Sequence, residues 1–305
     1  MKPELSIIIP CYNSQDTLEE AISSCFVQGL NNFEIIMVDD GSSDNTRELM
    51  NKLSKEHKEI KLFYHEKNKG GGATRNTAVE NSNSDIIFCL DSDDVLPPNT
   101  LSKMFSFIKE KNCDGVLFEE TRFFYDKNLK KTENIKNIII DKPITIEDFF
   151  KENVGFLNKV NFLYTKKSFQ DIGGYPEDHG FDTQTFGLRF LTNNKVSYVC
   201  KETFYFHRRS KKSLSYFMRE YKAGKVSFNF YLMYEDIIHL FKDDLIEKIF
   251  NFNIINNFYI EPDLGKIVNK YFLKKENTFI SEIENRSDFS LKVIEAIKSY
   301  KSGEY

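Results

Sequence analysis

Up to about residue 120, short apolar runs alternate with longer segments whose apolar residues recur at helical spacing. The short runs are rich in β-branched and aromatic side chains, which predicts strands. These runs are Leu5–Pro10, Glu34–Asp39, Ile60–His65, Ile86–Leu90 and Asp114–Glu119. The longer segments predict helices at Gln15–Gln28, Asp44–Lys55, Gly72–Asn81 and Pro98–Glu110. Strands that alternate with helices build parallel βαβ units, so we expect an α/β fold.

The rest of the chain has a different pattern. Residues 121–160 are charged and irregular, which predicts loops, with a strand near Ile138–Ile140 and a helix near Thr145–Asn153. From Ser213 to the end the apolar spacing is helical. We therefore expect one α/β domain over residues 1–212, made of the halves 1–120 and 121–212, followed by a helical C-terminal extension over 213–305.

Polar side chains gather where three of the predicted strands end, at Pro10–Asn13, Asp39–Ser43 and Asp91–Asp94. In an open parallel sheet the ligand lies at the carboxyl ends of the strands, so these groups converge on one edge. Carboxylates there suit a divalent cation that carries substrate phosphates, because Mg²⁺ takes few protein oxygens and fills its other positions with phosphate and water. An exposed turn or a helix N-cap is the structural alternative for Asp91–Asp94.

Composition narrows the class of protein. With 305 residues, 40% of them hydrophobic, the chain can bury a large core. Its five cysteines are odd in number and widely spaced, which favours buried thiols in a cytosolic protein over disulfides or a zinc site. The N-terminal apolar run Leu5–Ile9 is too short for a signal peptide or a membrane span, and no later segment is long enough to span.

Charge is unevenly distributed along the chain. Residues 1–206 carry 25 basic and 32 acidic side chains, whereas residues 207–305 carry 17 and 14. The part that contains the polar strand ends is therefore acidic, which leaves nucleic-acid binding unsupported.

The polar groups and their neighbours resemble the successive motifs of a known family. The matching segments are Ser6–Asn13, Val38–Thr46, Gly72–Asn76, Leu90–Asp94, Gly173–Arg189 and Tyr205–Ser215. Their order and spacing, over about 210 residues, are similar to those of family-2 inverting glycosyltransferases. The resemblance implies the GT-A fold, which is Rossmann-like with a mixed, mostly parallel sheet. It also implies an enzyme that uses a nucleotide-diphosphate sugar, with a UDP-sugar as the favoured donor.

The resemblance assigns roles to residues at the predicted sheet edge. The nucleotide-binding residues would be Pro10, Tyr12, Asn13, Asp40, Arg75, Asp91 and Ser92. Asp40 would accept the N3–H of uracil, and Asp91 would face the ribose. Asp93, the second aspartate of the Asp-x-Asp motif, would ligate Mn²⁺ or Mg²⁺ and so help to neutralise the leaving pyrophosphate. We assign Asp94 a supporting or capping role.

Gly70-Gly71-Gly72 lacks the Lys-Ser/Thr ending of a phosphate loop and the G-x-G-x-x-G spacing of a dinucleotide fold. We expect a flexible entry to a helix, with Arg75 reaching the nucleotide or an aspartate at the sheet edge. In a purely structural role, Arg75 would instead pair with Asp91 or Asp39.

The second half of the chain must supply a general base. By the resemblance, Asp182 would take the proton from the acceptor hydroxyl, an assistance worth roughly 10² to 10⁴-fold. Phe181 and Gln184 stand where the family has further carboxylates, so Asp182 lacks its usual acidic neighbours. Glu177 and Asp178 are alternative bases, and an N-cap for the following helix is the structural alternative for Asp182.

The basic segment from Arg208 to Lys225 contains seven basic side chains and one acidic one. Arg208, Arg209 and Ser213 could bind the diphosphate of the donor or of a lipid-linked acceptor. His207 could complete the metal shell, although a structural role is the commoner fate of a lone histidine. A solvated helix face is the alternative for the segment.

Apolar and aromatic residues recur at helical spacing over 214–241. Such a helix could lie on a membrane surface, form a homodimer, or pack on the catalytic domain.

Together with the resemblance, these features predict a metal-dependent inverting glycosyltransferase that acts on a saccharide acceptor, with or without a carrier lipid. The resemblance implies the synthesis of a bacterial surface or capsular polysaccharide as the setting. We expect it in the cytoplasm, with a peripheral position at the inner face of the cell membrane as an option. A non-catalytic protein that binds sugar nucleotides is one alternative. A nucleotidyltransferase is another, but it would need a basic phosphate loop that Pro10–Ser14 lacks.

Overall fold

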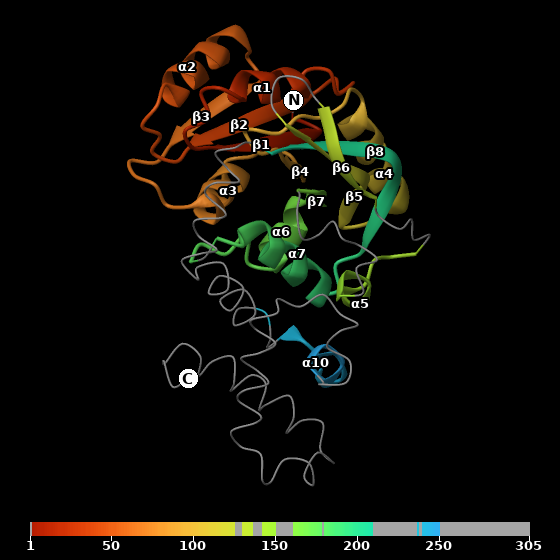
Figure 1. The fold of residues 1–305 in the computed structure, drawn as a ribbon. Helices are drawn as coiled ribbons and strands as arrows, with labels where there is room; N and C mark the ends of the chain where they lie inside the picture. Colours follow the sequence, from red (N-terminus) through yellow and green to blue (C-terminus); the bar gives the residue numbers. More distant parts are fainter. Residues whose placement is uncertain are drawn as a thin grey trace, which may run out of the picture. The chain divides into compact units, whose positions relative to one another are not determined.

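The computed structural model describes residues 2–125, 130–136, 142–150, 161–178, 180–209, 237 and 240–250 (Figure 1). The spatial contacts between Cα atoms divide the chain into two compact units. The first comprises Met1–Ile144 and Gly155–Lys211, and the second comprises Thr145–Val154 and Lys212–Tyr305.

A mixed sheet of eight strands forms the centre of the first unit. Its strands are β1 (Leu5–Cys11), β2 (Phe33–Asp39), β3 (Ile60–Tyr64), β4 (Ile86–Cys89), β5 (Gly115–Tyr125), β6 (Lys130–Lys136), β7 (Leu163–Thr165) and β8 (Ser197–Arg208). The order across the sheet is β3-β2-β1-β4-β7-β5-β6, and β8 pairs with β5. Strands β1 to β4 are parallel, β7 is antiparallel to β4 and β5, and β8 is parallel to β5. The predicted α/β fold is therefore confirmed.

Helices cover both faces of the parallel half of the sheet. The first unit contains α1 (Leu18–Cys25), α2 (Thr46–Glu56), α3 (Gly71–Glu80), α4 (Thr100–Lys111), α6 (Lys166–Asp171) and α7 (Asp182–Thr192). Figure 1 shows α1 and α2 on one side of β1, β2 and β3, and α3 on the other. Because both faces are covered, β1 and β4 are apolar along most of their length, and Ile7, Ile8 and Phe88 are 0% exposed.

The register of the strands brings the polar groups to one edge. Cys11, the last residue of β1, is the partner of Asp39, the last residue of β2. Ile8 of β1 is the partner of Cys89, the last residue of β4. The loops after these strands therefore leave the same edge of the sheet, as the sequence predicts.

The observed boundaries differ most from the predicted ones at the first helix and at the end of β5. The first helix begins at Leu18 rather than Gln15, because Ser14–Thr17 forms a turn in which the Ser14 carbonyl accepts hydrogen bonds from the amides of Thr17 and Leu18. Strand β5 extends to Tyr125, six residues beyond the predicted end, because it continues to pair with β8 as far as Arg208.

The second unit contains the described helices α5 (Ile146–Phe150) and α10 (Asp243–Phe250). Thr145 caps α5, since its hydroxyl accepts a hydrogen bond from the Asp148 amide at 3.2 Å. The predicted strand at 138–140 lies outside the described residues, as do the end of the predicted helix beyond residue 150 and most of 213–305. None of the described helices combines the length and the apolar character that crossing a membrane requires.

Candidate active site

Arg75, in the middle of α3, joins two of the predicted site residues. Its Nη2 donates a hydrogen bond to Asp91 Oδ1 at 2.6 Å, and its Nη1 donates one to Asp182 Oδ2 at 2.5 Å. The arginine is 8% exposed. Burial alone would lower the pKa of Arg75, but Asp182 and Asp91 raise that pKa well above its ordinary value. The guanidinium therefore stays charged between two carboxylates that lie 91 positions apart in the sequence.

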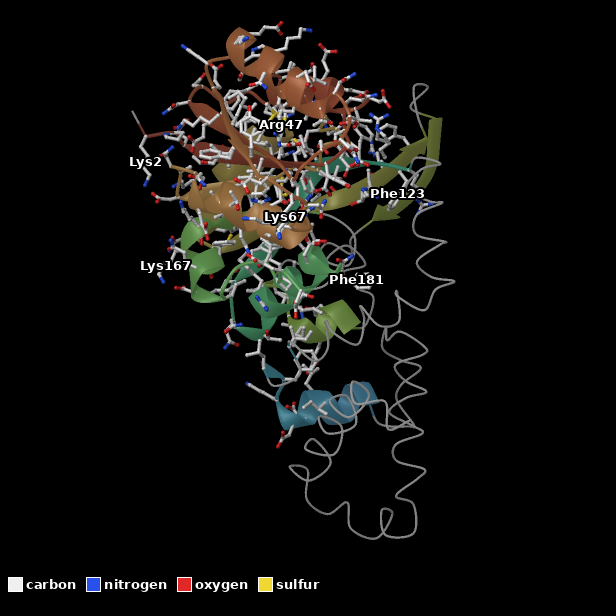
Figure 2. All side chains as sticks on the ribbon, turned by 90° about the vertical axis from the view of Figure 1, so that its left-hand side faces the viewer. Lys2, Arg47, Lys67, Phe123, Lys167 and Phe181 are labelled. Carbon is white, nitrogen blue, oxygen red and sulfur yellow. The ribbon has the colours of Figure 1, made fainter. Side chains whose placement is uncertain are left out.

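Asp182 is the first residue of α7, and its side chain is 12% exposed. Phe181, labelled in Figure 2, is the N-cap residue, so Asp182 lies in the first turn rather than at the cap position considered above. A carboxylate in a first helical turn is favoured by the helix dipole. Of the two alternative bases, Glu177 accepts a hydrogen bond from Asn76 Nδ2 at 2.7 Å.

The loop after β4 is anchored by Asp94. Its Oδ1 accepts a hydrogen bond from the Arg208 amide at 2.7 Å, and its Oδ2 accepts one from the Tyr205 hydroxyl at 2.7 Å. The backbones of Val95 and Phe206 pair in both directions, at 3.0 and 3.1 Å. The supporting role expected of Asp94 is thus to hold this loop against the end of β8.

Asp93 lies between two other carboxylates. Burial, Asp94 and Asp91 together raise the pKa of Asp93 to about 7. Among the described residues, no other side chain donates a hydrogen bond to the Asp93 carboxylate, and no group of three or more His, Cys, Asp or Glu is placed to hold a metal ion. A carboxylate such as that of Asp93 suits a divalent cation that takes one or two protein oxygens and completes its shell with substrate and water.

His207 pairs with Asp94 at the end of β8. Its Nδ1 lies 3.0 Å from Asp94 Oδ2, and its ring meets that of Phe123 edge-on. Burial would lower the pKa of His207, but Asp94 raises that pKa to about 9. The contacts of His207 with Asp94 and Phe123 are those of the structural role that we considered for it. Its role as a metal ligand stays a prediction.

Asp40 is held by the loop that precedes α3. Its Oδ1 accepts a hydrogen bond from the Lys69 amide at 2.8 Å, and its Oδ2 accepts one from the Gly70 amide at 3.0 Å. His65 Nδ1 lies 2.8 Å from Asp40 Oδ1, a contact that the sequence did not suggest. Asp40 is 3% exposed, so a bound base would have to reach a carboxylate that the chain already holds in place.

The other residues of the first two loops form a connected edge. Tyr12 is 51% exposed, which leaves its ring accessible to a planar ligand. Asn13 has a positive φ of 51°, and its Oδ1 accepts a hydrogen bond from the Ser43 amide at 2.8 Å. Pro10 precedes them in β1, paired with Val38. The hydroxyl of Ser92 lies 2.7 Å from that of Ser14, which ties the loop after β4 to the loop after β1.

Asp39 does not pair with Arg75. Arg47, labelled in Figure 2, donates to Asp39 Oδ2 through Nε at 3.0 Å and through Nη2 at 2.6 Å. Asp39 Oδ1 also accepts from the Ser42 amide at 3.3 Å, so Asp39 stabilises the local turn that follows β2. Asp44 likewise accepts from the Thr46 amide at the start of α2, at 3.0 Å.

The two arginines after His207 pack on the chain itself. Arg208 is 5% exposed; its Nε donates to the Asp93 carbonyl at 2.6 Å, and its Nη2 pairs with Glu20. Its guanidinium lies 4.6 Å from the centre of the Phe124 ring, and that of Arg209 lies 4.2 Å from the centre of the Phe123 ring. Arg208 therefore supports the Asp93 backbone, and Ser213 lies outside the described residues.

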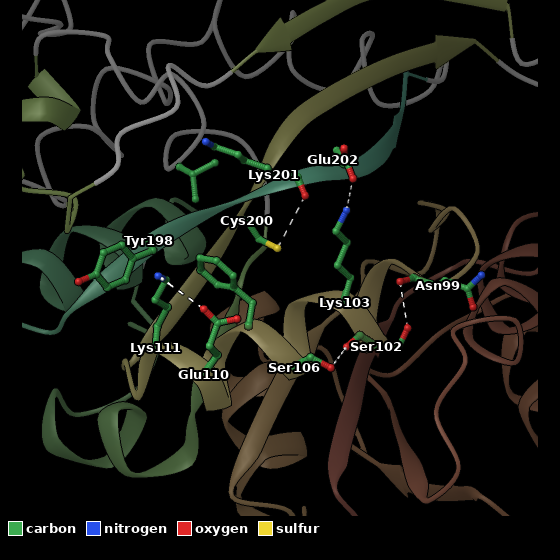
Figure 3. A pocket seen from close by; sticks show the side chains of 12 residues that line it. Asn99, Ser102, Lys103, Ser106, Glu110, Lys111, Tyr198, Cys200, Lys201 and Glu202 are labelled. Carbon is green, nitrogen blue, oxygen red and sulfur yellow. Dashed lines mark hydrogen bonds and ion pairs between the residues drawn. The ribbon is translucent and has the colours of Figure 1, made fainter.

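A groove of about 860 Å³ lies between α4 and β8 (Figure 3). Its rim includes an ion pair between Lys103 and Glu202, whose charged atoms are 2.5 Å apart. None of the predicted site residues lines this groove.

Comparison with known proteins identifies related sequences and a related fold. The family model "Glycosyl transferase family 2" matches residues 6–173. An uncharacterized glycosyltransferase of Haemophilus influenzae is 38% identical over 110 residues, which are 36% of this chain and 44% of that protein. A poly(ribitol-phosphate) beta-glucosyltransferase of Bacillus spizizenii is 27% identical over 80% of this chain and 38% of its own length. The chain thus spans less than half the length of these curated relatives.

Among solved structures, residues 1–349 of S. aureus TarS in complex with UDP-GlcNAc superpose with a TM-score of 0.64 and 19% identity, over 99% of this chain and 93% of that one. This similarity confirms the expected GT-A fold. Because the family model covers more than half of the sequence, the chain belongs to glycosyl transferase family 2.

Proposed function

We propose that this chain is a glycosyltransferase that moves a sugar from a UDP-sugar to a saccharide acceptor with inversion at the anomeric carbon. The observation that carries the proposal is the double contact of Arg75. It places Asp91, on the donor side, and Asp182, the candidate base, within the span of one guanidinium. A base so close to the donor subsite is what a single displacement requires.

The donor would bind along the loops after β1, β2 and β4. The exposed ring of Tyr12 can stack on the base, with Pro10 and Asn13 beside it, and Asp40 would accept from the base. Asp91 and Ser92 would contact the ribose. TarS was crystallised with UDP-GlcNAc, which supports a uridine donor for a chain of the same fold.

A divalent cation, Mn²⁺ or Mg²⁺, would be held by Asp93 and would supply neutralisation of the diphosphate leaving group. The position of Asp93 between Asp91 and Asp94, with no side-chain donor to its carboxylate among the described residues, supports this assignment. Asp94, Tyr205 and Arg208 would keep Asp93 in position through the contacts described above.

Asp182 would act as general base. Its carboxylate would take the proton of the acceptor hydroxyl while that oxygen forms a bond to the anomeric carbon. The bond from the anomeric carbon to the phosphate oxygen would break, and its electron pair would leave with UDP. One displacement from the face opposite UDP inverts the configuration.

The acceptor is proposed from the relatives. Their names include poly(ribitol-phosphate) transferases and a glucosyltransferase of Campylobacter jejuni whose name specifies an undecaprenol-linked saccharide. A cell-envelope polysaccharide or its lipid-linked precursor is accordingly the acceptor class that we propose. Such an acceptor would place the chain at the inner face of the membrane, with residues 214–241 as the candidate contact.

The test is release of nucleoside diphosphate from UDP-, GDP-, dTDP- and CDP-sugars, each with Mn²⁺ and with a chelator. We expect UDP from at least one UDP-sugar, at a rate that Mn²⁺ raises. Tight binding of a UDP-sugar with no release from any donor would favour the non-catalytic alternative. Pyrophosphate released from a nucleoside triphosphate would instead indicate a nucleotidyltransferase.

A further inference from the structure

The loop that leads to Asp182 is held by the first two turns of α3. Asn76 Nδ2 donates to the Tyr175 carbonyl at 2.9 Å, and the Tyr175 amide donates to Asn76 Oδ1 at 2.9 Å. One residue earlier on the helix, Arg75 makes its ion pair with Asp182. Two consecutive side chains of α3 therefore bind the segment from Tyr175 to Asp182.

The glycines before Arg75 make this close approach possible. A Cβ on Gly71 would lie 2.7 Å from Arg75 Nη1 and 2.8 Å from Asp182 Oδ2. A Cβ on Gly72 would lie 1.8 Å from the Pro176 carbonyl oxygen. Gly71 thus leaves room for the Arg75–Asp182 contact, and Gly72 leaves room for the loop at Pro176.

We infer that Arg75 is a positioning residue that couples the donor subsite to the base: it holds Asp182 and Asp91 at a set separation. This inference rests on the proposed function. Asp91 follows β4 in the donor-binding part of the chain, and Asp182 begins α7 in the acceptor part. No other described side chain contacts both carboxylates in an ion pair.

The chemistry of the guanidinium explains why arginine stands at this position. Its two terminal nitrogens point in set directions, so it can hold two carboxylates at once. A lysine ammonium keeps the charge but lacks the planar fork, so it cannot maintain both contacts in this geometry. The separation of Asp91 and Asp182 therefore depends on the shape of Arg75 as well as its charge.

The experiment measures kcat and donor KM from UDP release, with UDP-GlcNAc as the first donor tried. In Arg75→Met we expect kcat to fall about 100-fold and donor KM to rise about tenfold. Arg75→Lys should return donor KM to within about threefold of wild type while kcat stays at least about tenfold low. Lys195→Met serves as the matched control, because it removes a partly buried cation, paired with Asp171 at 2.6 Å, beyond the other end of α7.

Gly71→Ala is a second variant, which tests the Arg75–Asp182 contact without removing a charge. Its new Cβ would displace both Arg75 Nη1, 2.7 Å away, and Asp182 Oδ2, 2.8 Å away, so kcat should fall about tenfold with donor KM within about threefold of wild type. A double variant completes the test. The donor KM of the Arg75→Met, Asp91→Asn double variant should lie within about twofold of the donor KM of Asp91→Asn alone. This follows because Arg75 acts on the donor through Asp91.

The outcomes separate this inference from the proposed function. If wild type neither binds UDP nor releases it from any UDP-sugar, the proposed function is wrong and this inference falls with it. If wild type is active and Arg75→Lys or Gly71→Ala keeps full kcat, only the coupling role of Arg75 is wrong. Independent effects of Arg75→Met and Asp91→Asn on donor KM would likewise overturn the coupling.

Discussion

The hydroxyl of Tyr205 donates a hydrogen bond to Asp94 Oδ2 at 2.7 Å, and the two residues lie 111 positions apart. Tyr205 is 0% exposed and Asp94 is 1% exposed. A buried carboxylate needs several donors, and Asp94 also accepts from the Arg208 amide. The pair therefore joins the loop after β4 to the end of β8, and it determines where the adjacent Asp93 lies.

Removing this hydroxyl should weaken both the fold and the candidate metal site. In Tyr205→Phe the buried Asp94 loses one donor, and we expect a loss of about 1–3 kcal/mol in the free energy of unfolding. Urea unfolding measures that loss, and the Mn²⁺ concentration for half-maximal UDP release should rise. Tyr64→Phe is the control, because the Tyr64 hydroxyl bonds to Asn51 at the surface. Equal stability of the two variants would argue against an anchoring role for Tyr205.

Asp93→Asn should abolish the response to metal. The amide keeps the shape of the carboxylate but cannot neutralise a divalent cation, so UDP release should fall at least about 100-fold and become insensitive to Mn²⁺. The exposed Asp85, which pairs with Lys2, supplies the control Asp85→Asn. Metal-stimulated release at the wild-type rate in Asp93→Asn would place the metal elsewhere.

Asp182→Asn should separate turnover from donor binding. An amide cannot take the acceptor proton, so kcat should fall by about 10² to 10⁴-fold while the affinity for the UDP-sugar stays close to wild type. Single-turnover rates and calorimetric titration with UDP give the two quantities independently. An unchanged kcat would move the base to Asp178, to Glu177 or to another residue.

The residues at the carboxyl edge of the sheet could be predicted because the sequence patterns that mark them are local. Apolar runs identify β1, β2 and β4, and parallel topology then requires their carboxyl ends to share an edge. Polar residues immediately after those runs, such as Asp40 and Asp93, are therefore placed at that edge by sequence position alone. The same logic recovers the α/β fold and the helices α2, α3 and α4 to within two residues.

The contacts between distant segments were not predictable in this way. Strand β7 has three residues, and nothing in so short a run marks it as the antiparallel partner of β4. The sequence suggested Asp91 or Asp39 as the partner of Arg75, but the pairing of Arg75 with Asp182 depends on how the loop after Gly173 packs on α3. The sequence neighbours of Arg208 suggest a surface residue that binds a diphosphate. In the structure Arg208 is buried, because β8 pairs with β5. Such outcomes follow from tertiary packing, which has no local pattern.

The Glu34 carboxylate should make the unfolding free energy of the first unit depend on pH. Burial would raise the pKa of Glu34, but hydrogen bonds from Lys61, Ser6 and Asn83 lower it below its ordinary value. A carboxyl whose pKa is lower in the folded state than in the unfolded state stabilises the fold at pH values above its unfolded-state pKa of about 4.3. That contribution is lost as the pH falls through the folded-state pKa. At pH 7, Glu34→Gln should therefore lose about 1–3 kcal/mol of unfolding free energy.

Urea unfolding at several pH values checks this dependence. The difference between wild type and Glu34→Gln should shrink as pH falls from about 5 to about 3, because Glu34 becomes neutral in both states. The exposed Glu4 gives the control Glu4→Gln, for which we expect less than about 0.5 kcal/mol at any pH. A difference that stays constant with pH would mean that the charge of Glu34 does not contribute.

Gly72→Ala tests whether the start of α3 must touch the loop before α7. The new Cβ would lie 1.8 Å from the Pro176 carbonyl oxygen, and because that atom belongs to the backbone, the loop itself must move. We expect a loss of about 1–3 kcal/mol in unfolding free energy, together with a fall in kcat, because the displaced loop carries Asp182. Glu80→Ala, at the exposed end of the same helix, should change unfolding free energy by less than about 0.5 kcal/mol. Wild-type stability and turnover in Gly72→Ala would show that the loop can retreat without cost, and the steric role of the glycine run would then be wrong.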